Sequence, residues 1–497
     1  MTRKDRILSF TMLASLAVPK TTISIDEAIE RLGYGRFQIR VLVAAGLCFA
    51  ADAMEVLLLS FLAVVLQAIW NLTSQQTALL TSIVFVGQFG GTLTLGPLGD
   101  RIGRRPVFLL SALIIAIFGL GTAFCNTFTQ LVLVRMMVGF GVGGLLVPFD
   151  ILAELVPVEH RGRDLVFIEY FWTVGTMLVP IVAFFTLGNE MSDVHDNQDG
   201  WRYFVAICAL PCLFSAIIGT YLVPESPRWL LTVGKADKAM EILRQGAKAN
   251  RKDPFIVFPE GTTLKAEQPE ASSIKDLFDP VWRWITVYLW AAWAGFAFLY
   301  YGTILSTTLI FSDSPDDTHI SDSYTFDYGA IFVSGSAEVF GTTLAVFAID
   351  RIGRVPLQAI SFTVGGASIM LLAISVNVPD APRAVLMTFA FVARMFMMSG
   401  NITTWVATAE ILTTVIRTTG HSAANACARI GGFCAPYLVQ QSTPPLVVGG
   451  VMLGISLLTT LAVTRLPETK GKTLGLHPHH YDAAPVLSNQ EPESVMT

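Results

Sequence analysis

The sequence predicts an all-α membrane protein with twelve transmembrane helices in two six-helix pseudo-symmetric bundles. Hydrophobic residues make up 53% of the 497 residues and charged residues only 14%, whereas a soluble protein carries about 25% charged residues. Twelve apolar runs reach the length of roughly 20 residues that a helix needs to cross a bilayer. Motifs that follow spans in the first half of the chain recur after the corresponding spans of the second half.

The apolar runs divide the chain into five parts, because a long polar stretch interrupts them between the sixth and the seventh. We expect a cytoplasmic N-terminal segment, a first six-helix bundle, a cytoplasmic linker with short amphipathic helices, a second six-helix bundle, and a largely disordered cytoplasmic tail. These parts are expected at 1–39, 40–223, 224–283, 284–464 and 465–497. Within the first part, Ser24 and Glu27 have the spacing of a capping box, which predicts a short helix over 25–32.

The distribution of basic residues predicts the orientation in the membrane. If the N-terminus is cytoplasmic, 28 of the 33 Lys and Arg residues fall in cytoplasmic segments, and the outer loops hold only Arg202 and Arg383. We therefore expect a multi-pass protein of the plasma membrane or of an intracellular vesicle, with both termini in the cytoplasm. The net charge of −5 gives no general attraction to nucleic acid.

The six cysteines lie in or beside apolar stretches, without the spacing of a zinc site or a disulfide framework. We also find no nucleophile–base arrangement of His and Cys residues of the kind that an enzyme needs. The sequence therefore predicts no metal, no cofactor and no enzymatic activity, and it indicates no obligate protein partner.

Three repeated motifs at the expected cytoplasmic face indicate an internal duplication. Asp-Arg-Ile-Gly-Arg at 100–104 recurs at 350–354, the Glu and Arg pair of 154 and 161 recurs at 410 and 417, and Pro-Glu at 224–225 recurs at 467–468. Acids and arginines at matched positions predict ion pairs that break when this face opens. The expected latch residues are Asp100, Arg101, Arg104, Arg105, Asp150, Glu154, Arg161, Glu225, Arg228, Asp350, Arg351, Arg354, Glu410, Arg417 and Glu468. Alternatively, the arginines only anchor the loops on the positive side of the membrane.

These motifs resemble those of the major facilitator superfamily. Gly-Pro-Leu-Gly-Asp-Arg-Ile-Gly-Arg-Arg at 96–105 is similar to its signature loop, and Pro-Glu-Ser-Pro-Arg at 224–228 resembles a loop of its sugar-porter and organic-ion branches. The segments Asp-Ala-Met-Glu (52–55), Pro-Phe-Asp (148–150) and Tyr-Tyr-Gly (300–302) resemble the group of niacin, synaptic-vesicle-related and organic cation transporters. The resemblance implies the major facilitator fold and transport of a small organic solute by alternating access.

Ionisable residues inside the first span are candidates for binding a proton, because a charge at mid-bilayer is unfavourable unless it has a function or a partner. Asp52 and Glu55 are spaced by three residues and therefore share one helix face. Two acids at this distance raise the pKa of one of them. Alternatively, one acid pairs with an arginine and only holds helices together. Arg135, in the outer third of the fourth span, is expected to extend outward to the interface.

Further candidates for binding substrate or protons lie in the second half. They are Trp293, Tyr300, Tyr301, Glu338, Arg394 and Asn401. An aromatic ring can stack on a planar solute or hold an organic cation, and an arginine can hold a carboxylate or neutralise an acid. For each residue, ordinary core packing or a buried ion pair is the alternative.

The sequence therefore predicts a secondary active transporter whose partners are a small organic ion, protons and the lipid bilayer. The ion is expected to be a nicotinate-like carboxylate or an organic cation, carried with protons. Two alternatives are a sugar-porter-like facilitator and a non-transporting membrane protein of the vesicle type. The spans at 165–187 and 284–311 contain no Gln or Asn, the residues that hexose porters use in these spans, which disfavours a sugar.

Overall fold

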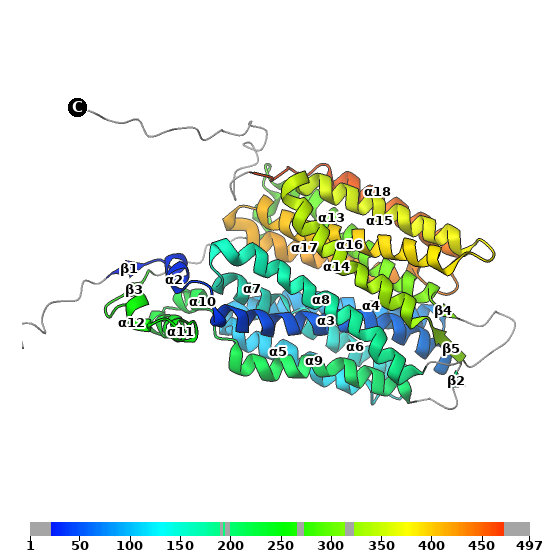
Figure 1. Ribbon diagram of the computed structural model, residues 1–497, viewed down its shortest axis with the longest axis horizontal. Helices are drawn as coiled ribbons and strands as arrows, with labels where there is room; N and C mark the ends of the chain where they lie inside the picture. Colours follow the sequence, from blue (N-terminus) through cyan, green and yellow to red (C-terminus); the bar gives the residue numbers. More distant parts are fainter. Residues whose placement is uncertain (1–20, 189–191, 194–198, 266–272, 314–322, 472–497) are drawn as a thin grey trace, which may run out of the picture. The chain divides into compact units, whose positions relative to one another are not determined.

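The computed structural model describes residues 21–188, 192–193, 199–265, 273–313 and 323–471, and it confirms the helical membrane fold (Figure 1). Eleven segments of this described part are long and apolar enough to span a bilayer. The remaining span, α17, has 25 residues and a lower hydropathy, because polar residues recur along it. The twelve spans are α3 (Arg36–Ile69), α4 (Ser74–Ile102), α5 (Arg104–Thr122), α6 (Phe128–Val142) with α7 (Leu146–Leu155), α8 (Val158–Leu187), α9 (Gly200–Leu222), α13 (Arg283–Ile310), α14 (Tyr328–Ile352), α15 (Arg354–Val376), α16 (Arg383–Ile411), α17 (Thr414–Leu438) and α18 (Pro445–Val463).

The packing of these helices forms two compact units. Unit 1 comprises Met1–Glu55, Gly87–Gly175 and Val205–Glu270, and unit 2 comprises Val56–Val86, Thr176–Phe204 and Ala271–Thr497. Each unit is described by itself below. Long helices such as α3 contribute one end to each unit.

Unit 1 contains a small subdomain of short elements beside its membrane helices. These elements are β1 (Thr22–Ile23), α2 (Ile25–Leu32), α10 (Pro227–Thr232), α11 (Ala236–Ala249), α12 (Pro254–Val257) and β3 (Thr263–Leu264). The predicted helix over 25–32 is confirmed as α2, and the Ser24 hydroxyl accepts from the backbone N–H of Glu27 at 3.1 Å. The β1 and β3 strands pair in parallel, and Figure 1 shows α2 and α11 side by side with them. The N-terminal segment and the central polar stretch thus fold together.

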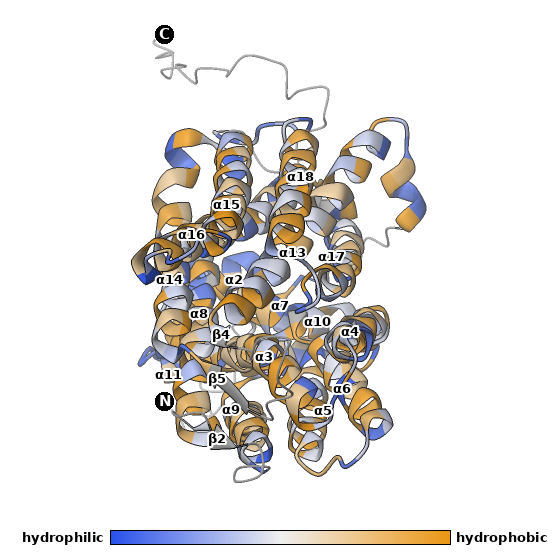
Figure 2. Cartoon of the chain, turned by 90° about the vertical axis from the view of Figure 1, so that its right-hand side faces the viewer, coloured by the Kyte–Doolittle hydropathy of each residue, from blue (hydrophilic) through white to orange (hydrophobic). Residues whose placement is uncertain are grey.

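Unit 2 places α15 against α16 and α18, and α13 against α17. The outer surface of α18 is apolar, with Leu457, Leu458 and Leu461 each more than half exposed, as expected of a face in lipid. Figure 2 shows the same predominance of apolar residues along α15 and α18. Unit 2 also holds the 3-10 helix η1 (Ile274–Phe278) and a small antiparallel sheet of β2 (Ser192–Asp193), β5 (Ser323–Phe326) and β4 (Ser312–Asp313).

The fourth span differs from the others because a turn divides it. Helix α6 ends at Val142, three residues (143–145) form a turn, and α7 begins at Leu146. Its counterpart in the second half, α16, is continuous over Arg383–Ile411. The glycines at 143 and 144 account for part of this difference, since glycine is the least favourable residue for a helix interior after proline.

Candidate functional site

A buried ion pair lies near the middle of α3 in unit 1. Arg135 Nη2, from α6, lies 2.8 Å from Glu55 Oε2, and the two side chains are 0% and 3% exposed. Asp52, one turn earlier on α3, is half-buried. Removing one partner of such a pair would leave an uncompensated charge in a medium of low dielectric. The Glu55 carboxylate and the Arg135 guanidinium therefore compensate each other inside unit 1.

The position of Arg135 corrects the sequence-based expectation that its side chain extends outward to the interface. The side chain is wholly buried and points to Glu55 instead. Hydropathy gives the depth of a residue along its helix but not the partner on a neighbouring helix. A signal was available in the sequence, because an unpaired acid in the first span requires a partner at similar depth.

A second buried ion pair lies in unit 2, and it has more partners. Arg394 Nη2, from α16, lies 2.6 Å from Glu338 Oε1, from α14, and both side chains are at most 1% exposed. The Tyr300 hydroxyl donates to the same carboxylate oxygen at 3.1 Å, and the Thr176 hydroxyl donates to the other at 3.3 Å. Three predicted site residues, Tyr300, Glu338 and Arg394, are thus brought together.

The two buried arginines are counterparts in the duplicated sequence. Arg135 lies nineteen residues before Glu154, and Arg394 lies sixteen residues before the matching Glu410. The turn between α6 and α7 lies within the first of these two intervals, whereas the second runs along the continuous helix α16. Each half of the chain therefore places one buried arginine in its fourth span and pairs it with a glutamate from another helix.

The other predicted residues of the second half, Trp293, Tyr301 and Asn401, have separate surroundings. Trp293 is fully buried and donates its indole N–H to the Thr408 hydroxyl at 2.8 Å. Tyr301 contacts Phe85 with ring centroids 4.7 Å apart. Asn401 is half-buried, and its Oδ1 has no hydrogen-bond partner within the described residues.

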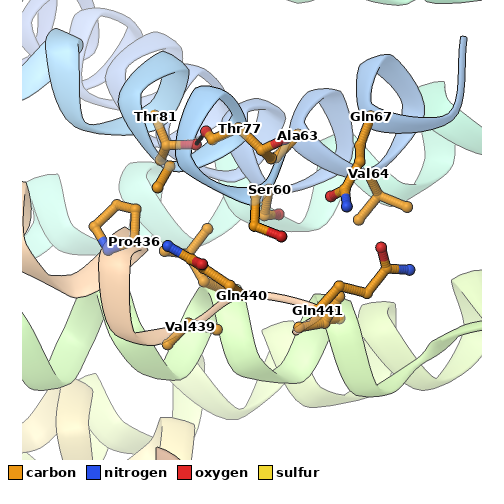
Figure 3. A pocket seen from close by; sticks show the side chains of 14 residues that line it. Ser60, Ala63, Val64, Gln67, Thr77, Thr81, Pro436, Val439, Gln440 and Gln441 are labelled. Atoms are coloured by element: carbon orange, nitrogen blue, oxygen red, sulfur yellow. Dashed lines mark hydrogen bonds between the residues drawn. The ribbon is translucent and has the colours of Figure 1, made fainter. Parts of the chain in front are cut away.

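A small hollow of about 40 Å³ lies in unit 2 between α3, α4, α13 and the segment that follows α17. Figure 3 shows its lining, in which hydroxyl and amide side chains such as Ser60, Gln67 and Gln440 alternate with apolar ones, and no charged side chain takes part. Ser60 also shares a hydrogen bond of 2.9 Å with Thr308 of α13. The Ser82 hydroxyl, on α4, donates to the carbonyl oxygen of Phe433 at 2.7 Å. These two contacts tie α3 and α4 to α13 and α17.

The first copy of the repeated motif is centred on Arg104 in unit 1. Its guanidinium lies 3.0 Å from Asp150, 3.3 Å from Glu154 and 3.6 Å from Asp100. Glu225 Oε1 accepts from the backbone N–H groups of Arg104 and Arg105, at 2.9 and 3.2 Å. Glu225 thus occupies the N-terminus of α5. An anion is stabilised there by the free N–H groups of the first turn.

The second copy is centred on Arg354 in unit 2. Arg354 binds Glu410 through two parallel bonds, Nε to Oε2 at 2.7 Å and Nη2 to Oε1 at 2.8 Å, and its Nη1 lies 3.0 Å from Asp350. Glu468 accepts from the backbone N–H groups of Arg354 and Val355, at 3.0 and 2.9 Å. This arrangement matches that of Glu225.

The glycine of each motif is required by this approach of a glutamate. Gly103 and Gly353 have φ angles of +113° and +110°, which favour glycine. A Cβ at Gly103 would lie 2.4 Å from Glu225 Oε2, and one at Gly353 would lie 2.7 Å from Glu468 Oε2. The Gly-Arg step in both motifs therefore leaves space for the carboxylate.

The remaining predicted latch residues are not part of these two centres. Arg101 and Arg351 are exposed, Arg105 Nη2 donates to the Thr220 carbonyl oxygen at 2.5 Å, and Arg228 pairs with Asp26 at 2.6 Å. Arg417 Nε donates to the carbonyl oxygen of Leu412 at 3.3 Å. The side chain of Arg161 lies outside the described part of the structure.

Comparison with solved structures supports the fold. The partially occluded inward open conformation of the xylose transporter XylE from E. coli aligns with a TM-score of 0.68, at 21% identity, covering 88% of this chain and 100% of that one. The crystal structure of the D-xylose-proton symporter aligns with a TM-score of 0.66, at 22% identity, covering 88% and 99%. At these identities the likeness concerns the fold alone.

Comparison with known sequences shows the family. The model described as "Sugar (and other) transporter" matches residues 25–480. The synaptic vesicle 2-related protein of Pongo abelii is 32% identical over 484 residues, covering 92% of this chain and 84% of that protein. The organic cation/carnitine transporter 7 of Arabidopsis thaliana is 29% identical over 459 residues, covering 85% and 89%. The chain therefore belongs to the sugar (and other) transporter family of the major facilitator superfamily, and it is a multi-pass membrane transporter that works by alternating access, not an enzyme.

Proposed function

We propose that the chain carries a small organic ion across its membrane together with protons. The solute is a nicotinate-like carboxylate or an organic cation. Both termini lie in the cytoplasm, and the membrane is the plasma membrane or that of an intracellular vesicle. One relative is named as an organic cation/carnitine transporter and another as a synaptic vesicle 2-related protein, and both names accord with this proposal.

The observation that carries the proposal is the Glu55–Arg135 pair. A carboxylate buried in mid-span is the natural carrier of a proton, because protonation removes a charge that is costly to expose to lipid. When Glu55 is protonated, its attraction to Arg135 falls and the site gains one positive charge. Proton binding on one side of the membrane and release on the other then drives the change of state.

The second pair supports an ionic solute. Arg394 Nε and Nη1 are buried and have no hydrogen-bond partner among the described residues, although Nη2 contacts Glu338. A guanidinium with unused donors can take a second carboxylate, since its geometry favours bidentate binding. A carboxylate solute would compete with Glu338 for Arg394. We place Glu338, Arg394 and Tyr300 among the groups that respond to the solute.

The centres around Arg104 and Arg354 act in this scheme as latches of one conformational state. Each gathers carboxylates from several segments onto one guanidinium, and each is only partly buried. Water that enters when this face opens would weaken these ion pairs. Their formation therefore favours the closed state of the face on which they lie.

A sugar-porter-like facilitator is the second candidate. The uncharged lining of the hollow at Ser60, Gln67 and Gln440 suits a neutral solute rich in hydroxyl groups. Two of the solved structures with this fold are named as xylose transporters or symporters.

The proposal is tested by uptake into proteoliposomes that contain the full chain. Labelled nicotinate, choline, carnitine and xylose are offered with and without an imposed pH gradient. We expect one organic ion to accumulate only with the gradient. The variant Glu55→Gln should reduce gradient-driven accumulation at least about tenfold, because an amide does not carry a proton, while exchange of labelled for unlabelled solute continues.

The control is Asp237→Asn, which makes the same change of charge on the exposed face of α11. It should behave as the unmodified chain. Accumulation by Glu55→Gln equal to that of the control would refute proton coupling at Glu55, and uptake of xylose alone would favour the facilitator.

A further inference from the structure

A polar stripe follows one face of α17. Arg417, His421, Asn425 and Arg429 are spaced by four residues, so they lie above one another on the same side of the helix. Side chains of this polarity do not face lipid at mid-membrane depth. His421 and Arg429 are half-buried, so the stripe lies largely against neighbouring helices.

An aromatic wall stands at the level of His421. The imidazole ring lies 5.1 Å from Trp293 and 4.9 Å from Trp405, measured between ring centroids, and the two indoles are 4.9 Å apart. Trp293 is fixed by its bond to Thr408. A Cβ at Gly431 would lie 2.0 Å from the Ala294 carbonyl oxygen, so α17 packs on α13 at backbone distance. The wall is therefore rigid, as stacking on a planar ring requires.

Polar atoms without partners lie around this wall. Within the described residues, His421 Nε2, Asn425 Nδ2 and Asn401 Oδ1 are buried and make no hydrogen bond. Asn425 is only 2% exposed. Because α16 and α17 run in opposite directions and Trp405 contacts His421, Asn401 and Asn425 each lie one turn from that contact, on the same side of it. Buried polar atoms are almost always satisfied, so such a group indicates a missing ligand.

A cationic group completes the arrangement. Arg429 Nη2 donates to Asn425 Oδ1 at 3.1 Å, and Arg429 Nη1 donates to the Tyr301 hydroxyl oxygen at 3.5 Å. These contacts hold the guanidinium next to the Asn425 amide, about 6 Å along the helix from the level of His421. An aromatic wall and a guanidinium with an adjacent amide donor are thus separated by about the length of a small substituted ring.

We infer that this surface binds a planar aromatic ring that carries a carboxylate. The ring lies against Trp405 and His421, and the carboxylate accepts from Asn425 Nδ2 and the Arg429 guanidinium. His421 Nε2 is placed to bond a heteroatom of the ring. The inference rests on the proposed transport of a small organic ion, and of the two kinds of ion considered above it selects the aromatic anion over the cation.

The first test is binding to the purified full chain in detergent, without any gradient. Labelled nicotinate is displaced by benzoate, by cyclohexanecarboxylate, which lacks the aromatic ring, and by N-methylpyridinium, which reverses the charge. We expect benzoate to compete at least about tenfold better than the other two compounds. Cyclohexanecarboxylate lacks the ring that would stack on the aromatic wall, and N-methylpyridinium lacks the carboxylate that would bind Asn425 and Arg429. Equal or stronger competition by N-methylpyridinium, or no saturable binding of any aromatic carboxylate, overturns the inference.

The second test is Asn425→Asp, which keeps the size of the side chain and places a negative charge beside Arg429. Affinity for benzoate should fall at least about tenfold, with N-methylpyridinium affected little. Ser422→Ala, on the exposed side of α17, is the matched control. Unchanged benzoate affinity in a folded, monodisperse Asn425→Asp protein contradicts the inference. If that variant does not fold, the competition order of the unmodified chain decides.

The binding competition, measured on Glu55→Gln, distinguishes a failure of this inference from a failure of the proposed proton coupling. Glu55→Gln should retain the competition order for aromatic anions, because Glu55 is not part of this surface. Loss of gradient-driven uptake with the order intact would leave the inference standing, whereas an altered order with coupling intact would refute the inference alone.

Discussion

The two copies of the Asp-Arg-Ile-Gly-Arg motif hold their arginines in different ways. In unit 2, Arg354 binds Glu410 through two parallel bonds, and the Thr469 hydroxyl donates to the same glutamate at 2.5 Å. In unit 1, Arg104 contacts three acids by single approaches, and the nearest is Asp150 at 3.0 Å. A hydroxyl, that of Ser226, again donates to the matching Glu154. The duplicated parts are conserved between the halves, but the geometry of the central pair is not.

The difference follows from one position. Asp150 of the first half corresponds to Val406 of the second, by the spacing that relates Glu154 to Glu410. With no third acid, Arg354 aligns Nε and Nη2 with Glu410 and leaves Nη1 to Asp350. With Asp150 present, Arg104 is shared among carboxylates that repel one another. The comparison teaches that one latch depends on the shape of the guanidinium and the other mainly on its charge.

The largest expected effect is the contrast between Arg354→Lys and Arg104→Lys. An ammonium cannot form the two parallel bonds to Glu410, so Arg354→Lys should destabilise the protein by about 2 kcal/mol. Arg104→Lys keeps a point charge among three acids and should cost less than about 1 kcal/mol. Thermal unfolding of the two purified variants at one scan rate measures the contrast. Equal shifts would show that the two latches depend on the guanidinium in the same way.

A smaller contrast is expected between Glu468→Gln and Glu225→Gln. The two oxygens of Glu468 accept from the backbone N–H groups of Arg354 and Val355, one each. In Glu468→Gln the amide N–H₂ group would face one of these donors, so the free energy of unfolding should fall by about 1–3 kcal/mol. Glu225 accepts through Oε1 alone, and its replacement should cost less than about 1 kcal/mol. The same unfolding measurement applies. A larger loss of stability in Glu225→Gln than in Glu468→Gln would contradict this interpretation of the contacts.

The smallest effect is expected for Asp150→Asn. An amide oxygen still accepts from Arg104, and the change relieves repulsion from Glu154 and Asp100, so stability should stay within about 0.5 kcal/mol of the unmodified chain. The variant also makes the first latch resemble the second. Combined with Arg104→Lys, it should raise the cost of that lysine. If the double variant is as stable as Asp150→Asn alone, the sharing of Arg104 among acids does not explain the difference between the latches.

The fold was predictable because the membrane imposes strong constraints on sequence. Twelve runs of sufficient length, recurring motifs and the spacing of Ser24 and Glu27 each correspond to an observed element. The turn at 143–145 was not predicted, since hydropathy continues across it and gives no information on backbone angles. The matched acids and arginines likewise indicated ion pairs at this face, and the structure pairs Arg104 with Glu154 and Arg354 with Glu410.

The candidate site was predictable only in part. Depth along a helix follows from the sequence, so Glu55, Glu338 and Arg394 were found as mid-span charges. Their partners depend on how helices pack, and this is why Arg135 was missed as the partner of Glu55. Trp293 stays a predicted solute contact, and the structure adds its bond to Thr408, its complete burial and its ring contacts with Trp405 and His421. His421 and Asn425 were detectable only as members of a four-residue spacing on α17.

The turn between α6 and α7 separates one buried arginine from two acids that an unbroken helix would hold in fixed register with it. Arg135 belongs to α6, and Asp150 and Glu154 belong to α7. A change of angle at the turn would displace both acids relative to Arg104 while Arg135 keeps its register against Glu55. In the first half, a turn therefore lies between the arginine that binds Glu55 and the acids that bind Arg104, whereas in the second half Arg394 and Glu410 lie on one continuous helix.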